Sequence, residues 1–140
     1  MADPTSVDEW WSLVKQHEAA AKMLCDNRDA AKMGYDHAAL AVECALKALI
    51  WHRERFNVRP SREERPELYS HNLRQLKDAA EIKVKHSDAS AACWFVVLQW
   101  DRGQYYDPKR MPRKVARAMV DAAFGDVGVV TWVRKQIFRK

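Results

Sequence analysis

The stretch that decides the fold is YDHAALAVECALKALI, residues 35–50. Its apolar residues recur every three or four positions, which is the spacing of one face of an α-helix. Several of them are alanines, whose small side chains allow a neighbouring helix to approach closely. The pattern predicts a helix from about residue 33 to about residue 56. The residues of this apolar stripe are Tyr35, Ala38, Ala39, Val42, Ala45, Leu46, Leu49 and Ile50.

The segments on either side of this stretch also predict helices. A first helix is expected over residues 7–27. Ser6 and Glu9 have the spacing of a capping box, in which the serine hydroxyl accepts the Glu9 amide and the Glu9 side chain reaches back. After the stretch, Ser70 or His71 opens a short third helix.

The C-terminal half predicts two more long helices. Ser87 caps a fourth helix that continues to Trp100 and is apolar on all sides, which is typical of a central or interface helix. Pro112 suits the first turn of the last helix. Gly125 and Gly128 weaken that last helix and favour a kink in it.

These elements predict an all-α fold, an up-and-down helical bundle of four long helices plus one short helix. The chain has 140 residues with only 4 Gly and 5 Pro, which argues against a fold of many short strands and tight turns. A single domain over 1–140 is expected, with an N-terminal tail at 1–6 and long loops at 57–66 and 101–111.

The composition excludes several classes of protein. The hydrophobic fraction of 48% is too high for a disordered chain. Cys25, Cys44 and Cys93 are widely spaced without a C-x-x-C pair, which indicates reduced thiols in a cytoplasmic protein. No signal peptide and no membrane-spanning stretch are expected. Neither a metal site nor a cofactor is predicted, because no motif for one is present.

The net charge of +5 is unevenly distributed. Residues 1–50 hold five basic and eight acidic side chains, whereas the rest of the chain holds 19 basic and 11 acidic side chains. An anionic partner is therefore expected to bind in the second part. One stretch there combines basic and aromatic residues, which suits the phosphates and bases of RNA or a nucleotide; the alternative is a solvated start of the last helix. The stretch contains Arg102, Tyr105, Tyr106, Lys109, Arg110, Arg113, Lys114 and Arg117.

Three segments resemble motifs of the HEPN family. Residues 41–49, AVECALKAL, resemble its A-x-E-x-A-L-K-A-L signature. Residues 71–76, HNLRQL, resemble its H-N-L-x-x-L segment, and residues 100–108, WDRGQYYDP, resemble its R-Y-x-P loop. The similarity extends over about residues 8–138.

The resemblance implies a small helical bundle, often dimeric, found in toxin–antitoxin and defence systems and commonly beside a minimal nucleotidyltransferase. Many members are metal-independent ribonucleases with an Arg-x(4–6)-His pair. In such a pair the arginine neutralises a phosphate and the histidine transfers a proton. Arg65 and His71 meet this spacing and are the candidate catalytic pair, although Pro66 follows the arginine. The later loop offers Arg102 but no histidine within reach.

Four polar residues, including His71, have two interpretations each. His71 and Asn72 either cap the third helix or bond a carbonyl across the bundle, or they face the same groove as Arg102 and Tyr106 and contact a phosphate or base. Glu43 and Lys47 lie one helical turn apart. They are either an exposed ion pair or a polar pair that lines the groove and orients Arg102.

We therefore expect a HEPN-like nucleotide- or RNA-binding module that partners a nucleotidyltransferase or acts in a bacterial toxin–antitoxin or defence system. The alternatives are a metal-independent HEPN endoribonuclease toxin and a purely structural dimerisation module. A homodimer through the second and fourth helices is expected. The reason is that six tryptophans exceed what a small bundle easily buries, and tryptophan is favoured at interfaces.

Overall fold

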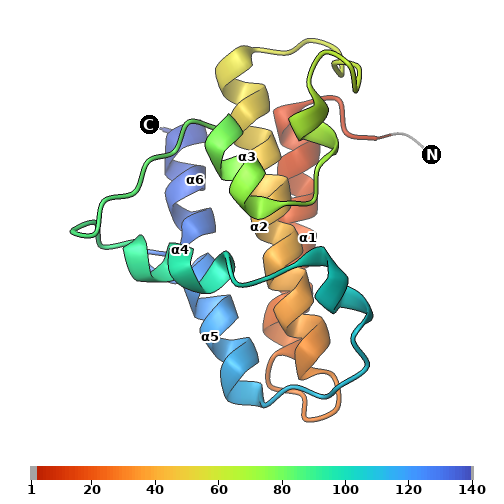
Figure 1. Cartoon of the computed structure of the whole chain (residues 1–140), viewed down its shortest axis with the longest axis vertical. Coiled ribbons are helices and arrows are strands. Elements are labelled where there is room, and N and C mark those ends of the chain that lie inside the picture. Colours follow the sequence, from red (N-terminus) through yellow and green to blue (C-terminus); the bar gives the residue numbers. More distant parts are fainter. Residues whose placement is uncertain (1–2, 140) are drawn as a thin grey trace.

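The protein is all-helical in a computed structural model that describes residues 3–139, and this range contains no strand (Figure 1). The predicted all-α class is therefore confirmed. The α-helices are α1 (Val7–Leu24), α2 (Ala31–Glu54), α3 (Leu73–Ala79), α4 (Ala91–Val97), α5 (Arg113–Phe124) and α6 (Val129–Ile137). Two short 3-10 helices, η1 (Pro66–Tyr69) and η2 (Arg102–Tyr106), precede α3 and α5.

Helix α2 is the centre of the bundle. Seventeen of its 24 residues are buried, and it packs against α1, α3, α5 and α6. Figure 1 shows it running along the length of the molecule with the other helices around it. Because neighbours cover it on several sides, three polar residues are buried with the apolar stripe. These are Asp36, Glu43 and Lys47.

Helix α1 begins where the sequence predicts, with a modified cap. The Ser6 hydroxyl accepts the Glu9 amide at 3.1 Å, as expected. The Glu9 side chain accepts the amide of Thr5 at 2.9 Å instead of the Ser6 amide. The first half of the capping box is thus confirmed, and the second half is displaced by one residue.

Helix α4 is shorter than expected. It follows Ser90, whereas Ser87 was the predicted cap. The Asp88 carboxylate accepts the Lys85 amide at 2.8 Å, which folds the residues before α4 into a turn. Phe95 is 69% exposed, so α4 is not buried on all sides. The apolar sequence identified the helix, but it did not reveal where the turn would stop it.

The last predicted helix is divided into α5 and α6. A Cβ on Gly128 would lie 2.7 Å from the Ala123 carbonyl, so this close turn requires glycine. The Thr131 hydroxyl donates to the Gly125 carbonyl at 2.7 Å and fastens the turn. The predicted kink is therefore a complete break. The bundle differs accordingly from four long helices plus one short helix, because α3 to α6 have only 7 to 12 residues each.

Most of the tryptophan side chains are buried within the single chain. Five of the six are buried and Trp132 is half-buried. Trp10 and Trp51, for example, pack with ring centroids 6.2 Å apart. The premise that six tryptophans exceed what this bundle can bury is therefore wrong, and the tryptophans give no support to a subunit interface. α2 likewise has little exposed apolar surface left for a second subunit.

The three cysteines are free thiols. Cys25 and Cys44 are buried and Cys93 is half-buried. Burial, assisted by the charge of Glu43, raises the pKa of the Cys44 thiol to about 12. Cys44 therefore behaves as a small core residue.

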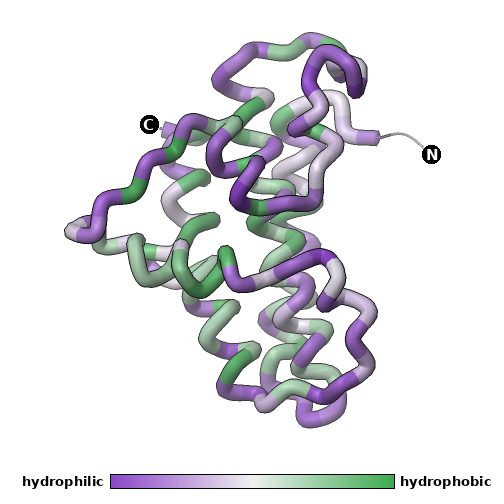
Figure 2. Tube along the Cα trace, viewed as in Figure 1, coloured by the Kyte–Doolittle hydropathy of each residue, from purple (hydrophilic) through white to green (hydrophobic). Residues whose placement is uncertain are grey.

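The loops lie at the ends and along one side of the bundle, and Figure 2 shows that they are mostly hydrophilic. The connection from α2 to η1 spans residues 55–65, close to the predicted loop at 57–66. The predicted loop at 101–111 contains η2 and is therefore partly ordered as a helix. Among the residues described, no helix has both the length and the apolar character needed to cross a bilayer.

Gly34 lies where α2 comes closest to the end of α1. A Cβ at this position would lie 2.6 Å from the backbone nitrogen of Cys25 and 2.8 Å from its Cα. We expect Gly34→Ala to lower the free energy of unfolding by about 1–3 kcal/mol, because backbone atoms cannot rotate away. This cost outweighs the better helix propensity of alanine.

Urea denaturation measures this loss. The control is Met33→Ala at the exposed neighbouring position, which should change the free energy by less than about 0.5 kcal/mol. A Gly34→Ala protein as stable as the wild type would contradict the close approach of the two helices.

Candidate functional site

A buried ion pair on α2, formed by Glu43 and Lys47, contacts the ring of His71. The Glu43 and Lys47 side chains are only 7% and 5% exposed, and Lys47 Nζ lies 3.1 Å from Glu43 Oε2. His71 Nδ1 lies 3.0 Å and 3.2 Å from the two carboxylate oxygens. The interpretation of Glu43 and Lys47 as an exposed ion pair is therefore wrong. The residue that the pair contacts is His71, whereas Arg102 was the expected partner.

The contact with Glu43 fixes how His71 presents its ring. A carboxylate only accepts hydrogen bonds, so His71 Nδ1 carries the proton that is donated to it. The Nε2 atom is then left for a ligand. The His71 side chain is 48% exposed, which makes this nitrogen accessible to small molecules. A histidine held in this way is oriented for binding or proton transfer.

His71 and Arg102 line the same cavity, which has a volume of about 190 Å³. One wall comes from the start of α3 and the other from the segment between α4 and η2. This arrangement matches the expectation for His71 and Arg102, but Tyr106, which was expected in the same groove, does not line this cavity. The polar lining residues are His71, Asn72, Arg74, Gln99, Asp101 and Arg102.

Asn72 has a structural role at the edge of this cavity. Its side chain accepts the amide of Gln75 at 3.1 Å and caps α3. The capping interpretation is thus confirmed for Asn72, while its position still lines the cavity. Arg74, the second residue of α3, was not identified from the sequence because nothing in its spacing sets it apart from other surface arginines.

Aromatic rings continue from the cavity along η2. The Arg102 guanidinium lies 5.4 Å from the Tyr105 ring centroid, which is within cation–π range. The Tyr105 and Tyr106 rings meet edge to face at 5.4 Å. Tyr106 is 75% exposed, so its ring is available to stack on a planar ligand.

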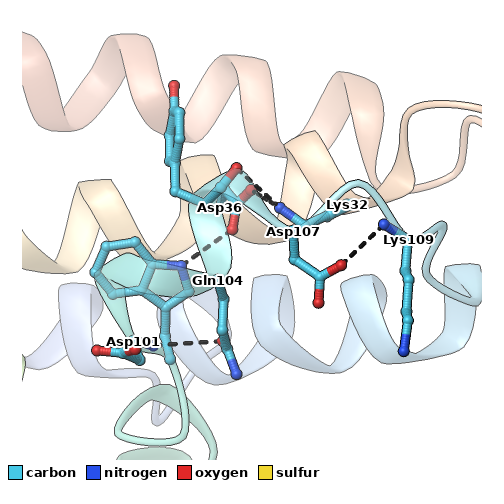
Figure 3. A network of polar contacts seen from close by, with 8 residues as sticks. Lys32, Asp36, Asp101, Gln104, Asp107 and Lys109 are labelled. Carbon is cyan, nitrogen blue, oxygen red and sulfur yellow. Dashed lines mark hydrogen bonds and ion pairs between the residues drawn. The ribbon is translucent and has the colours of Figure 1, made fainter.

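Asp36 anchors η2 to the central helix (Figure 3). This carboxylate is buried and accepts the Trp100 indole N–H at 3.0 Å. Lys32 Nζ donates to Asp36 at 2.8 Å and also to the Tyr105 carbonyl at 3.2 Å. Figure 3 also shows Asp101 bonded to Gln104, which caps η2. Sequence reasoning missed this network, and the only signal for it was an acid inside the apolar stripe.

The basic stretch after η2 is partly neutralised by the loop between α1 and α2. Arg110 pairs with Asp29 at 3.2 Å, and Arg117 pairs with Asp26 at 2.6 Å. The Arg113 guanidinium donates to the backbone carbonyl of Asp26 at 3.5 Å. The stretch therefore does not present all of its cations freely to solvent.

Lys109 and Arg110 belong to a second cavity of about 250 Å³, which they line together with Lys32 and Asp36. The backbone amide of Lys109 donates to Asp107 at 3.0 Å (Figure 3). Of the predicted binding residues, Asn72 and Arg102 thus line the first cavity and Lys109 and Arg110 line the second, while the others line neither.

Arg65 is engaged elsewhere. Its guanidinium forms ion pairs with Glu54 and, at 3.1 Å, with Glu67. It lines a cavity beside Arg53 at the end of α2, whereas His71 lines the cavity with Arg102. The structure therefore does not bring Arg65 and His71 together in one cavity. The turn of η1, which begins at Pro66, lies between them in the chain.

Two further histidines, His17 and His37, form a contact between α1 and α2. His17 Nδ1 and His37 Nδ1 are 2.9 Å apart. Burial lowers the pKa of His17, the neighbouring His37 lowers it further, and Glu43 opposes both effects. The folded state thus favours neutral His17.

This lowered pKa predicts a dependence of stability on pH. The unfolded chain binds a proton at His17 more readily than the folded chain does, so the free energy of unfolding is highest above about pH 6.5. It falls as the pH drops below that value. We expect the loss between pH 7.5 and pH 5.5 to be larger in the wild type than in His17→Gln, as measured by urea denaturation in EDTA. The exposed His86→Gln control should keep the wild-type dependence, and equal losses in wild type and His17→Gln would contradict it.

Residues 3–139 hold no group of three or more His, Cys, Asp or Glu side chains placed to bind a metal ion.

No family model, no curated protein and no solved structure matches this chain.

Proposed function

We propose that this chain is a HEPN-like module that binds RNA or a nucleotide in the cavity of His71 and Arg102. In this proposal it partners a nucleotidyltransferase or acts in a bacterial toxin–antitoxin or defence system. The main observation in its favour is that one cavity is lined by residues from two separate HEPN-like segments, namely His71, Asn72 and Arg102. The third such segment supplies Glu43 and Lys47, which hold His71.

The residues around the cavity suit a phosphate joined to a base. Arg74 and Arg102 offer guanidinium forks, which bind phosphate oxygens in pairs. Tyr105 and Tyr106 offer rings, and stacking on such rings contributes about 1–3 kcal/mol per base. A cavity of about 190 Å³ is too small for a duplex. It suits a phosphate group or a single base, with the rest of the strand or nucleotide lying outside it.

Fluorescence anisotropy with a labelled single-stranded RNA and with a labelled nucleotide tests this proposal. We expect Arg102→Ala to weaken binding about 10- to 100-fold, because a charged hydrogen bond contributes about 1.5–3 kcal/mol. Arg134→Ala, an exposed arginine on α6, is the matched control and should leave affinity nearly unchanged. Binding that Arg102→Ala leaves intact would contradict the site.

The oriented His71 also favours a second function, a metal-independent endoribonuclease. Glu43 fixes the tautomer of His71, and Arg102 lines the same cavity and could neutralise the scissile phosphate. The alternative partner is Arg65, whose spacing from His71 fits the family pair but whose side chain is held by two glutamates.

Incubation with RNA in EDTA distinguishes these assignments. Cleavage that is lost in His71→Ala and Arg102→Ala but kept in Arg65→Ala supports the cavity assignment. Cleavage that depends on Arg65 supports the pair expected from the spacing. Intact RNA with the wild-type protein would exclude the nuclease under these conditions and leave the binding proposal standing.

A homodimer is the remaining part of the proposal, and α4 offers its surface. Phe95 is exposed beside an apolar groove of about 280 Å³ between α4 and α5, which also includes Val96 and Val115. A two-fold axis would place each Phe95 near the groove of the other copy. Light scattering of Phe95→Asp tests this. A dimeric wild type and a monomeric variant are expected, and a dimer without RNA or nucleotide affinity would favour the purely structural module.

A further inference from the structure

His17 and His37 form a contact that the proposed cavity does not use. His17 lies on α1 and His37 on α2, 20 positions apart in the chain. Their Nδ1 atoms are 2.9 Å apart and their ring centroids 5.2 Å apart, with the planes inclined by 35°. Both residues are half-buried, so solvent reaches this part of the seam between the helices.

The two Nδ1 atoms are at hydrogen-bonding distance, and a metal ion could take the place of the proton between them. Imidazole nitrogens bind Zn²⁺ at about 2.0–2.1 Å in a tetrahedral arrangement, which places two such nitrogens roughly 3.3 Å apart. To match this value, the observed separation of 2.9 Å needs to increase by about 0.4 Å, and both rings need to turn so that their Nδ1 atoms face the ion. In the observed contact one Nδ1 donates its proton to the other; when both Nδ1 atoms bind an ion, each neutral ring carries its proton on Nε2 instead.

We propose that His17 and His37 are the protein ligands of a site for a divalent first-row transition metal. Imidazole suits zinc, copper and nickel, whereas magnesium and calcium prefer oxygen ligands. With two protein ligands, water fills the other positions, and the ion is exchangeable. The negative charge of Glu43, which acts on His17, also favours a cation here.

Such an ion joins the two longest helices. α1 and α2 form the most extensive helix pair of the bundle. A metal that binds the folded chain and not the separated histidines stabilises the folded state by mass action. The site therefore predicts a metal-dependent increase in thermal stability that magnesium does not reproduce.

Isothermal titration with Zn²⁺ at 25 °C tests this inference on the full chain. One equivalent is expected to bind the wild type, and His17→Gln and His37→Gln should each weaken binding at least tenfold. His86→Gln, which removes an exposed histidine from the loop before α4, should bind like the wild type. The three cysteines are present in every variant, so thiol binding does not explain a difference between them.

Thermal denaturation supplies a second readout, since a substitution that changes stability could obscure the titration. We expect Zn²⁺ to raise the Tm of the wild type and of His86→Gln, with no increase for His17→Gln or His37→Gln. The proposal is overturned if Zn²⁺ leaves the wild type unchanged. It is also overturned if the two histidine variants bind Zn²⁺ as well as the wild type, or if Mg²⁺ gives the same increase.

Discussion

The Lys47→Met variant is expected to unfold with a free energy about 3–5 kcal/mol lower than the wild type, the range for breaking a buried ion pair from one side. Lys47 and Glu43 are 5% and 7% exposed, so the substitution leaves the Glu43 carboxylate buried without its cation. His71 still contacts Glu43, but that ring lies at the solvent-exposed end of the pair. Equilibrium denaturation in urea measures the change.

The chain contains a matched control for this prediction. Glu18 and Lys22 form the same type of pair, four residues apart, on the exposed face of α1. Lys22→Met should therefore change stability by less than about 0.5 kcal/mol. The double variant Glu43→Leu/Lys47→Met should recover much of the loss, because it buries no unpaired charge. Equal effects of Lys22→Met and Lys47→Met would show that burial does not decide the outcome.

Asp36→Leu is expected to cost about 3 kcal/mol or more, since it removes the acceptor of two buried donors. The Trp100 indole N–H and the Lys32 ammonium both bond to Asp36 in the wild type. Because Lys32 also holds the Tyr105 carbonyl, the variant should loosen η2 and weaken any binding that depends on it.

Two controls separate the parts of this effect. Asp36→Asn keeps an oxygen for Trp100 and should cost less than Asp36→Leu. Asp29→Leu removes a mostly exposed acid that pairs with Arg110 at the surface, and it should be nearly neutral. The NMR signal of the Trp100 indole N–H should shift in Asp36→Leu. An unchanged signal and unchanged stability would contradict the anchoring role.

The parts of the fold that depend on local pattern were predictable. The apolar period of residues 35–50 identified α2, and Ser6 identified the start of α1. Glycines at 125 and 128 marked the position of a bend, but its size depends on the Thr131 bond to the Gly125 carbonyl. The limits of α4 were not predictable, because the turn at Asp88 competes with a continuous apolar pattern.

Of the residues in the site, the sequence predicted only those that belong to a recognisable motif. His71 and Arg102 were both identified, and the packing of α3 against the segment before η2 brings them together. Arg65 satisfied a spacing rule, yet two nearby glutamates hold it elsewhere. Asp36 and the contact of His17 with His37 were missed, since a hydrogen bond between separate elements leaves no period in the sequence.

The central position of α2 has a consequence for the synthesis of the chain. α1 and α2 are complete at residue 54, but α5 and α6, which cover the far side of α2, are complete only at residue 137. At a translation rate of about 5–20 residues per second, the ribosome needs roughly 4–17 s to make the intervening segment. During that interval the nascent hairpin exposes the apolar residues of α2 that α5 and α6 later cover.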